Sequence, residues 1–255
     1  MGVVAGRLIA PVLHAWPVGV AVAVILLVWQ GTTALFGLPA YVLPTPLDIA
    51  FGAVANHALL LEGLQTTLAE TLMGFAAGAA LGFGLAVLFV LVPPVEALGM
   101  PVVVAINTVP SVAFVPLALI WFGVGMASKV ALAALAVSFA VMVNTVAGLK
   151  RPEHAAVDLL RSFGAGRLGV LWRLRLPAAL PSVVTGLRVG LARSTIAVVV
   201  AEMLGAYAGV GQIIYQATAQ VDYVVVWAAV LSTSLASLGL YGLLVAIDRK
   251  LVWWS

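Results

Sequence analysis

The chain has 255 residues, of which 12 are Lys or Arg and 9 are Asp or Glu, so 8% are charged where an ordinary soluble domain has about 25%. Hydrophobic residues make up 64%, the mean hydropathy is +1.20, and no soluble fold has enough interior to hide so much apolar surface. A water-soluble globular protein is therefore excluded, and the net charge of +3 is too thinly spread for a nucleic-acid-binding protein.

Six apolar stretches are long enough to cross a bilayer, which takes about 20 residues in a helix. They predict an all-α, polytopic membrane protein. No small-residue cleavage site directly follows the first apolar run, so we interpret it as a retained span and not as a signal peptide. The predicted spans cover about residues 16–36, 66–92, 98–121, 127–148, 179–203 and 225–247.

The spans divide the chain into three predicted parts. Residues 1–62 hold the first span and an external Pro-rich segment, and residues 63–247 form the main transmembrane domain. Residues 248–255 are predicted to be a short cytoplasmic tail.

The second span has glycine at every fourth position. Gly74, Gly78 and Gly82 follow Glu70 at this spacing, which allows two helices to approach closely. The contact is either packing within one subunit or a dimer interface. Glu70 is expected near the outer end of the span, within reach of water.

The third span contains Pro110 and Pro116, and proline removes a backbone hydrogen bond and kinks a helix. Broken helices in transporters expose backbone groups where they line a cavity, although a kink can also serve packing alone. Asn107 and Ser111 are four residues apart, which predicts that they share a helix face. Both are candidate pathway residues.

The loop between the fourth and fifth spans predicts an amphipathic helix over residues 152–166. Pro152 suits its first turn, and Gly164 is placed to end it. Its apolar stripe includes Leu159, Leu160 and Phe163. Such a helix either lies on the bilayer surface or docks in a groove of a partner protein, and the pattern alone leaves both interpretations open.

The fifth span contains Arg193 and Glu202. An ionisable side chain at membrane depth costs about 2.5 kcal/mol or more, which makes it a functional candidate by default. Arg193 lies deep in the span and is predicted to face the subunit interior. Glu202 lies near the outer end, where it would meet the segment 205–222 or gate an exit. Both are candidate pathway residues.

Lys and Arg gather on one side of the predicted spans. The loop 149–178 contains six of them, whereas the segments 37–65 and 204–222 contain none. Because short cytoplasmic loops carry an excess of Lys and Arg, this loop and both termini are predicted to be cytoplasmic. Lys129, at the edge of the fourth span, is the exception.

The cytoplasmic loop resembles a known signature. It reads Asp158-Leu159-Leu160, then Gly164, then Leu174-Arg175-Leu176-Pro177. This is similar to the EAA segment of ABC importer permeases, with Asp in place of Glu and two Leu in place of Ala. A wider similarity to the nitrate, sulfonate and taurine branch of these type I, binding-protein-dependent inner-membrane components is carried by residues 43–46, 108–117, 120–125, 176–181, 186–188 and 201–205.

The resemblance implies an ABC-transporter type I transmembrane domain over residues 63–247. It implies a multi-pass permease subunit of the bacterial plasma (inner) membrane that moves a small solute inward by alternating access. The implied partners are two cytoplasmic ABC ATPases, a second permease copy as a homodimer, an external solute-binding protein and membrane lipid. The residues that it assigns to ATPase coupling are Asp158, Leu159, Leu160, Phe163, Gly164 and Pro177.

No catalytic or cofactor motif accompanies these features. A P-loop requires a Gly-Lys pair, which the chain lacks, so ATP and Mg²⁺ are assigned to the partner ATPase. Cysteine is absent and the three histidines lie in separate regions, so no metal site is predicted. The chain is accordingly predicted to be a transport subunit and not an enzyme.

The solute and the transport mechanism are left open between three possibilities. Arg193 suits an anion such as nitrate, a sulfonate or taurine. The same type of importer carrying a vitamin precursor is an alternative. The alternative from another class is a proton-coupled secondary transporter in which Glu70 or Glu202 is the protonatable group.

Overall fold

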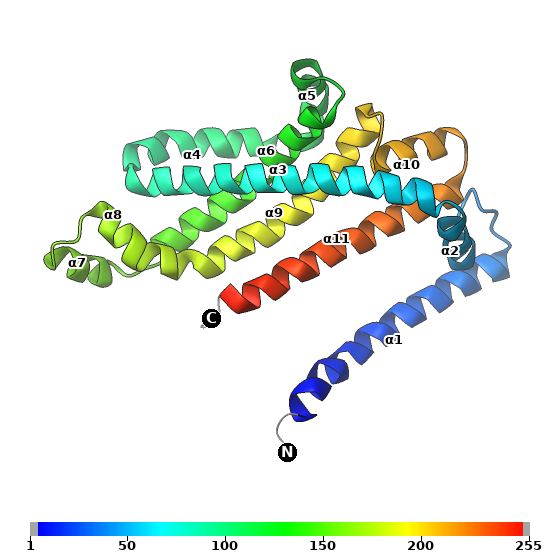
Figure 1. Cartoon of the computed structure of the whole chain (residues 1–255), viewed down its shortest axis with the longest axis horizontal. Helices are drawn as coiled ribbons and strands as arrows, with labels where there is room; N and C mark the ends of the chain where they lie inside the picture. The colour runs from blue at the N-terminus through cyan, green and yellow to red at the C-terminus, as the bar shows by residue number, and fades with distance from the viewer. Residues whose placement is uncertain (1–4, 252–255) are drawn as a thin grey trace.

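The computed structural model describes residues 5–251, with the burial of side chains described for residues 16–248 (Figure 1). This part of the chain contains helices and no strand, which confirms the predicted all-α class. The elements are α1 (Ala5–Phe36), α2 (Pro46–Ala55), α3 (His57–Leu91), α4 (Pro93–Thr108), η1 (Ser111–Phe114), α5 (Val115–Phe122), α6 (Met126–Lys150), α7 (His154–Ser162), α8 (Arg167–Val170), η2 (Leu171–Arg175), α9 (Leu176–Gly205), α10 (Val210–Ala219) and α11 (Tyr223–Leu251).

The third predicted span is the one that the structure changes most. Among the described residues, five helices are long and apolar enough to cross a membrane, and a sixth crossing requires α4 and the η1–α5 segment, which meet at 91°. A single helix over residues 98–121 is therefore wrong. Val109 precedes a proline and is extended (ψ 126°), and Pro110 has no amide hydrogen, so α4 ends at Thr108.

The second span begins earlier than predicted, at His57 and not at residue 66. At 35 residues, α3 is about 52 Å long, well beyond the roughly 30 Å of a hydrocarbon core. Polar residues in its first turns, among them Glu62 and Gln65, had placed those turns outside the apolar stretch. The predicted boundary between residues 62 and 63 falls inside this continuous helix.

A short helix, α2, occupies the segment that was predicted only as Pro-rich. The hydroxyl of Thr45 accepts a hydrogen bond from the Asp48 amide at 3.1 Å, and the Asp48 carboxyl group accepts one from the Thr45 amide at 3.3 Å. This reciprocal capping box, with Pro46 in the first turn, begins a helix. The sequence contained that signal at residues 45–48.

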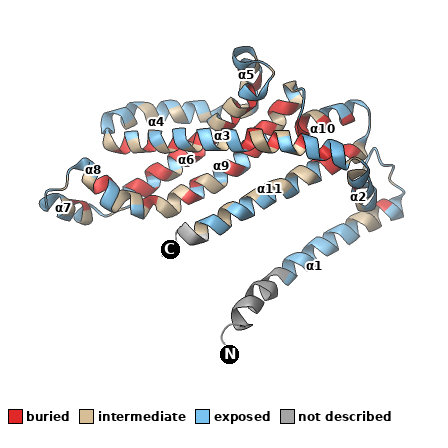
Figure 2. Cartoon of the chain, viewed as in Figure 1, coloured by how far each residue is buried: buried red, intermediate tan, exposed pale blue. Residues whose placement is uncertain are grey.

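Three long helices, α3, α6 and α9, form the centre of the bundle, and buried residues concentrate where they meet (Figures 1 and 2). The glycine stripe of α3 faces α6 of the same chain. A Cβ atom added at Gly82 would lie 2.3 Å from the carbonyl oxygen of Ser138, and one at Gly78 would lie 2.5 Å from that of Ala134. The two backbones therefore approach more closely than side chains would allow.

The first helix, α1, joins the bundle at its C-terminal end. The Trp29 ring meets the Trp227 ring of α11 edge to face, with centroids 5.1 Å apart. The indole N–H of Trp29 also donates to the carbonyl of Pro44 at 3.2 Å. Most of the described surface of α1 is apolar and exposed (Figure 2).

Helix α7, in the loop between α6 and α9, is shorter than the predicted range of 152–166. It begins at His154, because Glu153 is extended (ψ 145°) and serves as its N-cap, so Pro152 lies before the first turn. Gly164 ends the helix in the left-handed region (φ +84°). Backbone hydrogen bonds of 2.9 and 3.0 Å, from the amides of Gly164 and Ala165, close a Schellman turn there.

Candidate translocation cavity

A cavity of about 370 Å³ lies at the break between α4 and η1. Helices α3, α4, α6 and α9 and the η1 turn form its walls, which are mainly apolar. Four polar side chains reach it: those of Asn107, Ser111, Ser138 and Arg193. An apolar cavity with a few converging polar groups is typical of a small-molecule site.

Arg193 is the only charged residue among the described residues that line this cavity. Its Nη1 atom lies 3.5 Å from Oδ1 of Asn107. The prediction that Arg193 faces the subunit interior is corrected, because its side chain is exposed in the single chain. Leu191 and Ser194 occupy the buried face of α9, and helical geometry places Arg193 outside that face.

Asn107 and Ser111 line the same cavity, but not for the predicted reason. They were expected to share one helix face, whereas α4 ends at Thr108 and Ser111 begins the η1 turn. The 91° bend brings both side chains to the cavity. Ser138 was not predicted: its hydroxyl donates to a carbonyl of its own helix at 2.9 Å, so the sequence gives no signal for it.

Glu202 lies apart from this cavity, at the junction of α9 and α10. Its buried carboxyl group accepts hydrogen bonds from the Thr67 hydroxyl at 2.8 Å and from the Gly211 amide at 2.7 Å. Glu202 therefore contacts the segment after α9, and the structure does not bring it together with Asn107, Ser111 and Arg193.

Glu70 is 3% exposed, which corrects the expectation that it lies within reach of water. It sits beside Glu202 and Lys129 in one buried cluster that joins α3, α6 and α9. The Lys129 ammonium donates to the carbonyl of Gly205 at 2.6 Å and to that of Gly125 at 3.2 Å. Lys129 is therefore no free loop charge, which explains why it departs from the charge asymmetry of the other loops.

Thr67→Val is expected to lower the free energy of unfolding by about 1–3 kcal/mol, because it removes the donor to Glu202 and the acceptor of the Val210 amide (2.8 Å) from a buried site. Thr66→Val is the matched control, since the Thr66 hydroxyl bonds only to the Glu62 carbonyl one turn earlier. The measurement is the midpoint of thermal unfolding in detergent. Equal shifts in both variants would contradict the assignment.

Helix α7 lies at the opposite end of the bundle from α10 and exposes apolar side chains there (Figure 1). Phe163, at its C-cap, is 80% exposed, and Leu159 is also exposed. Val157 is the buried residue of α7, and Leu160 is half-buried. Asp158 is exposed and lies 3.7 Å from Arg161 on the same helix.

Pro177 belongs to the first turn of α9, apart from α7. It has no amide hydrogen to donate to the carbonyl four residues earlier. Directly before α9 the chain forms a π turn, η2, over Leu171–Arg175. From Arg167 onward, α8, η2 and α9 therefore form one continuous helical path, which is widened only at η2.

An all-helical bundle of apolar spans, with a polar-lined cavity at a broken span and an exposed amphipathic helix at one end, defines a polytopic membrane transport protein. The family model described as "Binding-protein-dependent transport system inner membrane component" matches residues 74–253. The chain belongs to this family, and it is a permease subunit of an ABC importer in the bacterial inner membrane.

Curated relatives cover nearly the whole chain. The riboflavin transport system permease protein of Chloroflexus aurantiacus is 32% identical over 245 residues, covering 94% of this chain and 91% of that protein. The taurine transport system permease protein of Escherichia coli K12 is 31% identical over 239 residues, covering 91% and 87%.

A solved structure supports the fold. A chain of the MetNI methionine ABC transporter, in an inward-facing conformation, matches with a TM-score of 0.59 at 20% identity, covering 74% of this chain and 98% of that chain. Family membership favours the ATP-driven importer over the proton-coupled secondary transporter that was the alternative from another class.

Proposed function

We propose that the chain forms the membrane pathway of an importer for a small oxyanion such as nitrate, a sulfonate or the sulfonate group of taurine. The observation that carries the proposal is Arg193, the only charged side chain among the described residues lining the cavity. A guanidinium binds an oxyanion through two parallel N–H donors. The cavity volume of about 370 Å³ suits a small solute.

Two neutral side chains complete the proposed site. Asn107, 3.5 Å from Arg193, holds the guanidinium toward the cavity, and Ser111 offers a hydroxyl from the other side of the helix break. Glu202 is placed by its hydrogen bonds to Thr67 and Gly211, so its proposed role is to hold α10 against α9 and not to contact solute.

Coupling to ATP hydrolysis is assigned to α7. Its exposed Leu159 and Phe163 would seat in a groove of a cytoplasmic ABC ATPase, with Asp158 and the half-buried Leu160 supporting the contact and Gly164 ending the helix. Two such ATPases would hold ATP and Mg²⁺, since this chain has no Gly-Lys pair for a P-loop. Pro177, at the start of α9, would transmit the movement of α7 to the membrane spans. That movement would drive alternating access.

Two further partners are part of the proposal. The exposure of Arg193 in the single chain supports a second copy that would close the pathway, as a homodimer. The arginine-rich end that carries α7 is assigned to the cytoplasm by its charge. The α10 end then faces outward, where an external solute-binding protein would deliver the solute.

A vitamin or vitamin precursor is the second candidate solute. It is favoured by the 32% identity to the riboflavin permease of C. aurantiacus. The lone guanidinium in the cavity favours an oxyanion over a solute that has no negative group.

Arg193→Ala is expected to lower uptake of the oxyanion by at least about tenfold, because a charge-assisted hydrogen bond contributes about 1.5–3 kcal/mol. The measurement is ATP-driven uptake of nitrate, taurine and riboflavin into proteoliposomes containing the permease, its ATPase and its binding protein. Arg173→Ala removes an exposed guanidinium outside the cavity and should leave uptake unchanged. Undiminished uptake by Arg193→Ala, or wild-type uptake of riboflavin alone, would overturn the oxyanion proposal.

A further inference from the structure

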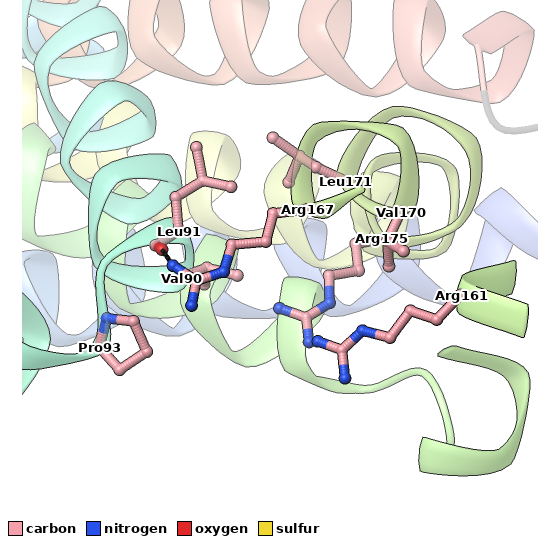
Figure 3. Close-up of a pocket in the computed structure, with 8 residues that line it drawn as sticks. All are labelled: Val90, Leu91, Pro93, Arg161, Arg167, Val170, Leu171 and Arg175. Carbon is pink, nitrogen blue, oxygen red and sulfur yellow. Dashed lines mark hydrogen bonds between the residues drawn. The ribbon is translucent and has the colours of Figure 1, made fainter. Parts of the chain in front are cut away.

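A second pocket, of about 150 Å³, lies at the arginine-rich end of the bundle. Its floor is apolar and comes from the C-terminal end of α3 and from the α8–η2 path. Three arginines reach it from different elements: Arg161 from α7, Arg167 from α8 and Arg175 from η2 (Figure 3). A pocket of this volume holds roughly five water volumes, which is space for one phosphate group.

The positive charge of this pocket is largely uncompensated within the described residues. No carboxylate lines it, and the carboxylate of Asp158, which forms an exposed ion pair with Arg161 at 3.7 Å, is not among the lining groups. Arg167 donates only to the carbonyl of Leu91, at 3.5 Å (Figure 3). Guanidinium groups that share one small pocket repel one another, and a bound anion would remove that repulsion.

The pocket lies at the boundary between an apolar surface and a charged surface. Val90 and Leu91 belong to the last turn of the apolar helix α3, and Pro93 begins α4 beside them. On the neighbouring helical path, Trp172 is 68% exposed and Leu168, four residues earlier, is exposed on the same face. Tryptophan is enriched at the level of lipid headgroups, where its ring is apolar and its N–H is wet.

We propose that the pocket of Arg161, Arg167 and Arg175 binds the phosphate group of an anionic phospholipid, with Trp172 and Leu168 at the level of its acyl-chain ends. Basic pockets between helices at the cytoplasmic face are suited to anionic headgroups. The exposed Trp172 and Leu168 beside the pocket favour a lipid over an acidic protein segment as the source of the anion. The pocket shares no lining residue with the cavity of Arg193, and the proposal is independent of the transported solute.

The test uses the full chain, purified in detergent, titrated with phosphatidylglycerol and followed by native mass spectrometry. The double variant R161Q/R175Q is expected to bind phosphatidylglycerol at least about tenfold more weakly, because two charge-assisted contacts to one phosphate are lost. R173Q is the matched control for the single variants R161Q and R175Q: it removes one positive charge from the same loop, but Arg173 does not line the pocket. Its binding should stay close to that of the wild type. R161Q alone, at an exposed position, provides the measurement if the double variant does not fold.

Separate arms identify the source of the phosphate. Phosphatidylcholine, which has no net charge, should bind much more weakly than phosphatidylglycerol, and millimolar inorganic phosphate should not displace the lipid. Displacement by inorganic phosphate would overturn the lipid assignment in favour of a free anion. Equal losses in R161Q/R175Q and R173Q would overturn it in favour of general loop charge. Unchanged lipid binding together with lost co-purification of an ATPase would show that the arginines meet an acidic protein surface.

Discussion

Replacing Phe163 with Asp is expected to abolish coupled transport while leaving the permease inserted and folded. The ring is 80% exposed at the C-cap of α7, beside the exposed Leu159, so it supports nothing within its own chain. An apolar anchor buried at the centre of an interface contributes about 2 kcal/mol or more, which is a roughly 30-fold loss of affinity when it is removed. A carboxylate in its place also has to be desolvated in an apolar groove.

The measurements are ATP-driven uptake in proteoliposomes and co-purification of the ATPase with the permease. Ser162→Asp is the matched control, because it adds the same charge to the adjacent exposed position, where the native hydroxyl bonds only to the carbonyl of Leu159 at 2.7 Å. Uptake by Phe163→Asp at the level of Ser162→Asp would show that α7 is not the coupling surface. Lost membrane insertion would show instead that Phe163 has a structural role.

Replacing Gly82 with Val is expected to lower the free energy of unfolding by about 3 kcal/mol or more, at the upper end of what overpacking costs. The first added carbon alone would lie 2.3 Å from the backbone carbonyl of Ser138, and backbone cannot rotate away as a side chain can. Helices α3 and α6 would have to separate along much of their contact, which is the most extensive in the described chain.

Gly84→Val provides the control two residues further along α3. A Cβ atom there meets nothing within 4 Å, and the substitution adds the same atoms to the same helix. The amount of folded protein and its unfolding temperature in detergent should therefore fall for Gly82→Val alone. If both variants lose stability equally, helix propensity and not the approach of α3 to α6 is responsible.

Most of the fold could be predicted from the sequence, because the main requirement of a bilayer, an apolar span, is directly visible in the sequence. A span must be apolar for its full length, so α1, α3, α6, α9 and α11 appear as long stretches almost free of charge. Their ends were less accurate. The first turns of α3 contain polar residues that extend beyond the apolar stretch, and the start of α2 depended on a capping box at Thr45 rather than on hydropathy.

The candidate site was predicted less completely, because its geometry depends on a turn. Pro110 signalled a kink, but not that α4 and α5 would meet at 91° and enclose a cavity. Arg193 and Asn107 can each be identified from the sequence as polar residues in apolar spans, but their proximity depends on tertiary packing. The phosphate-sized pocket was hidden for the same reason, since its three arginines lie on three separate elements.

Thr67 illustrates the limit of the sequence. A threonine in a helix usually satisfies its hydroxyl on its own backbone, as the adjacent Thr66 does. Nothing in the sequence distinguishes the two, yet Thr67 bonds across 135 residues to the carboxyl group of Glu202. Only the packing of α3 against α9 decides which hydroxyl is available for that contact.

The position of Lys129 has a consequence for movement. Its ammonium bonds both to the turn that precedes α6 and to the end of α9, where Gly205 lies 76 residues beyond Lys129 in sequence. Drawing these two turns apart would leave a buried cation without its acceptors, at a cost of about 3–5 kcal/mol. The two turns therefore belong to one rigid unit. Opening at that end of the molecule has to come from tilting whole helices about the α3–α6–α9 core, not from bending either turn alone.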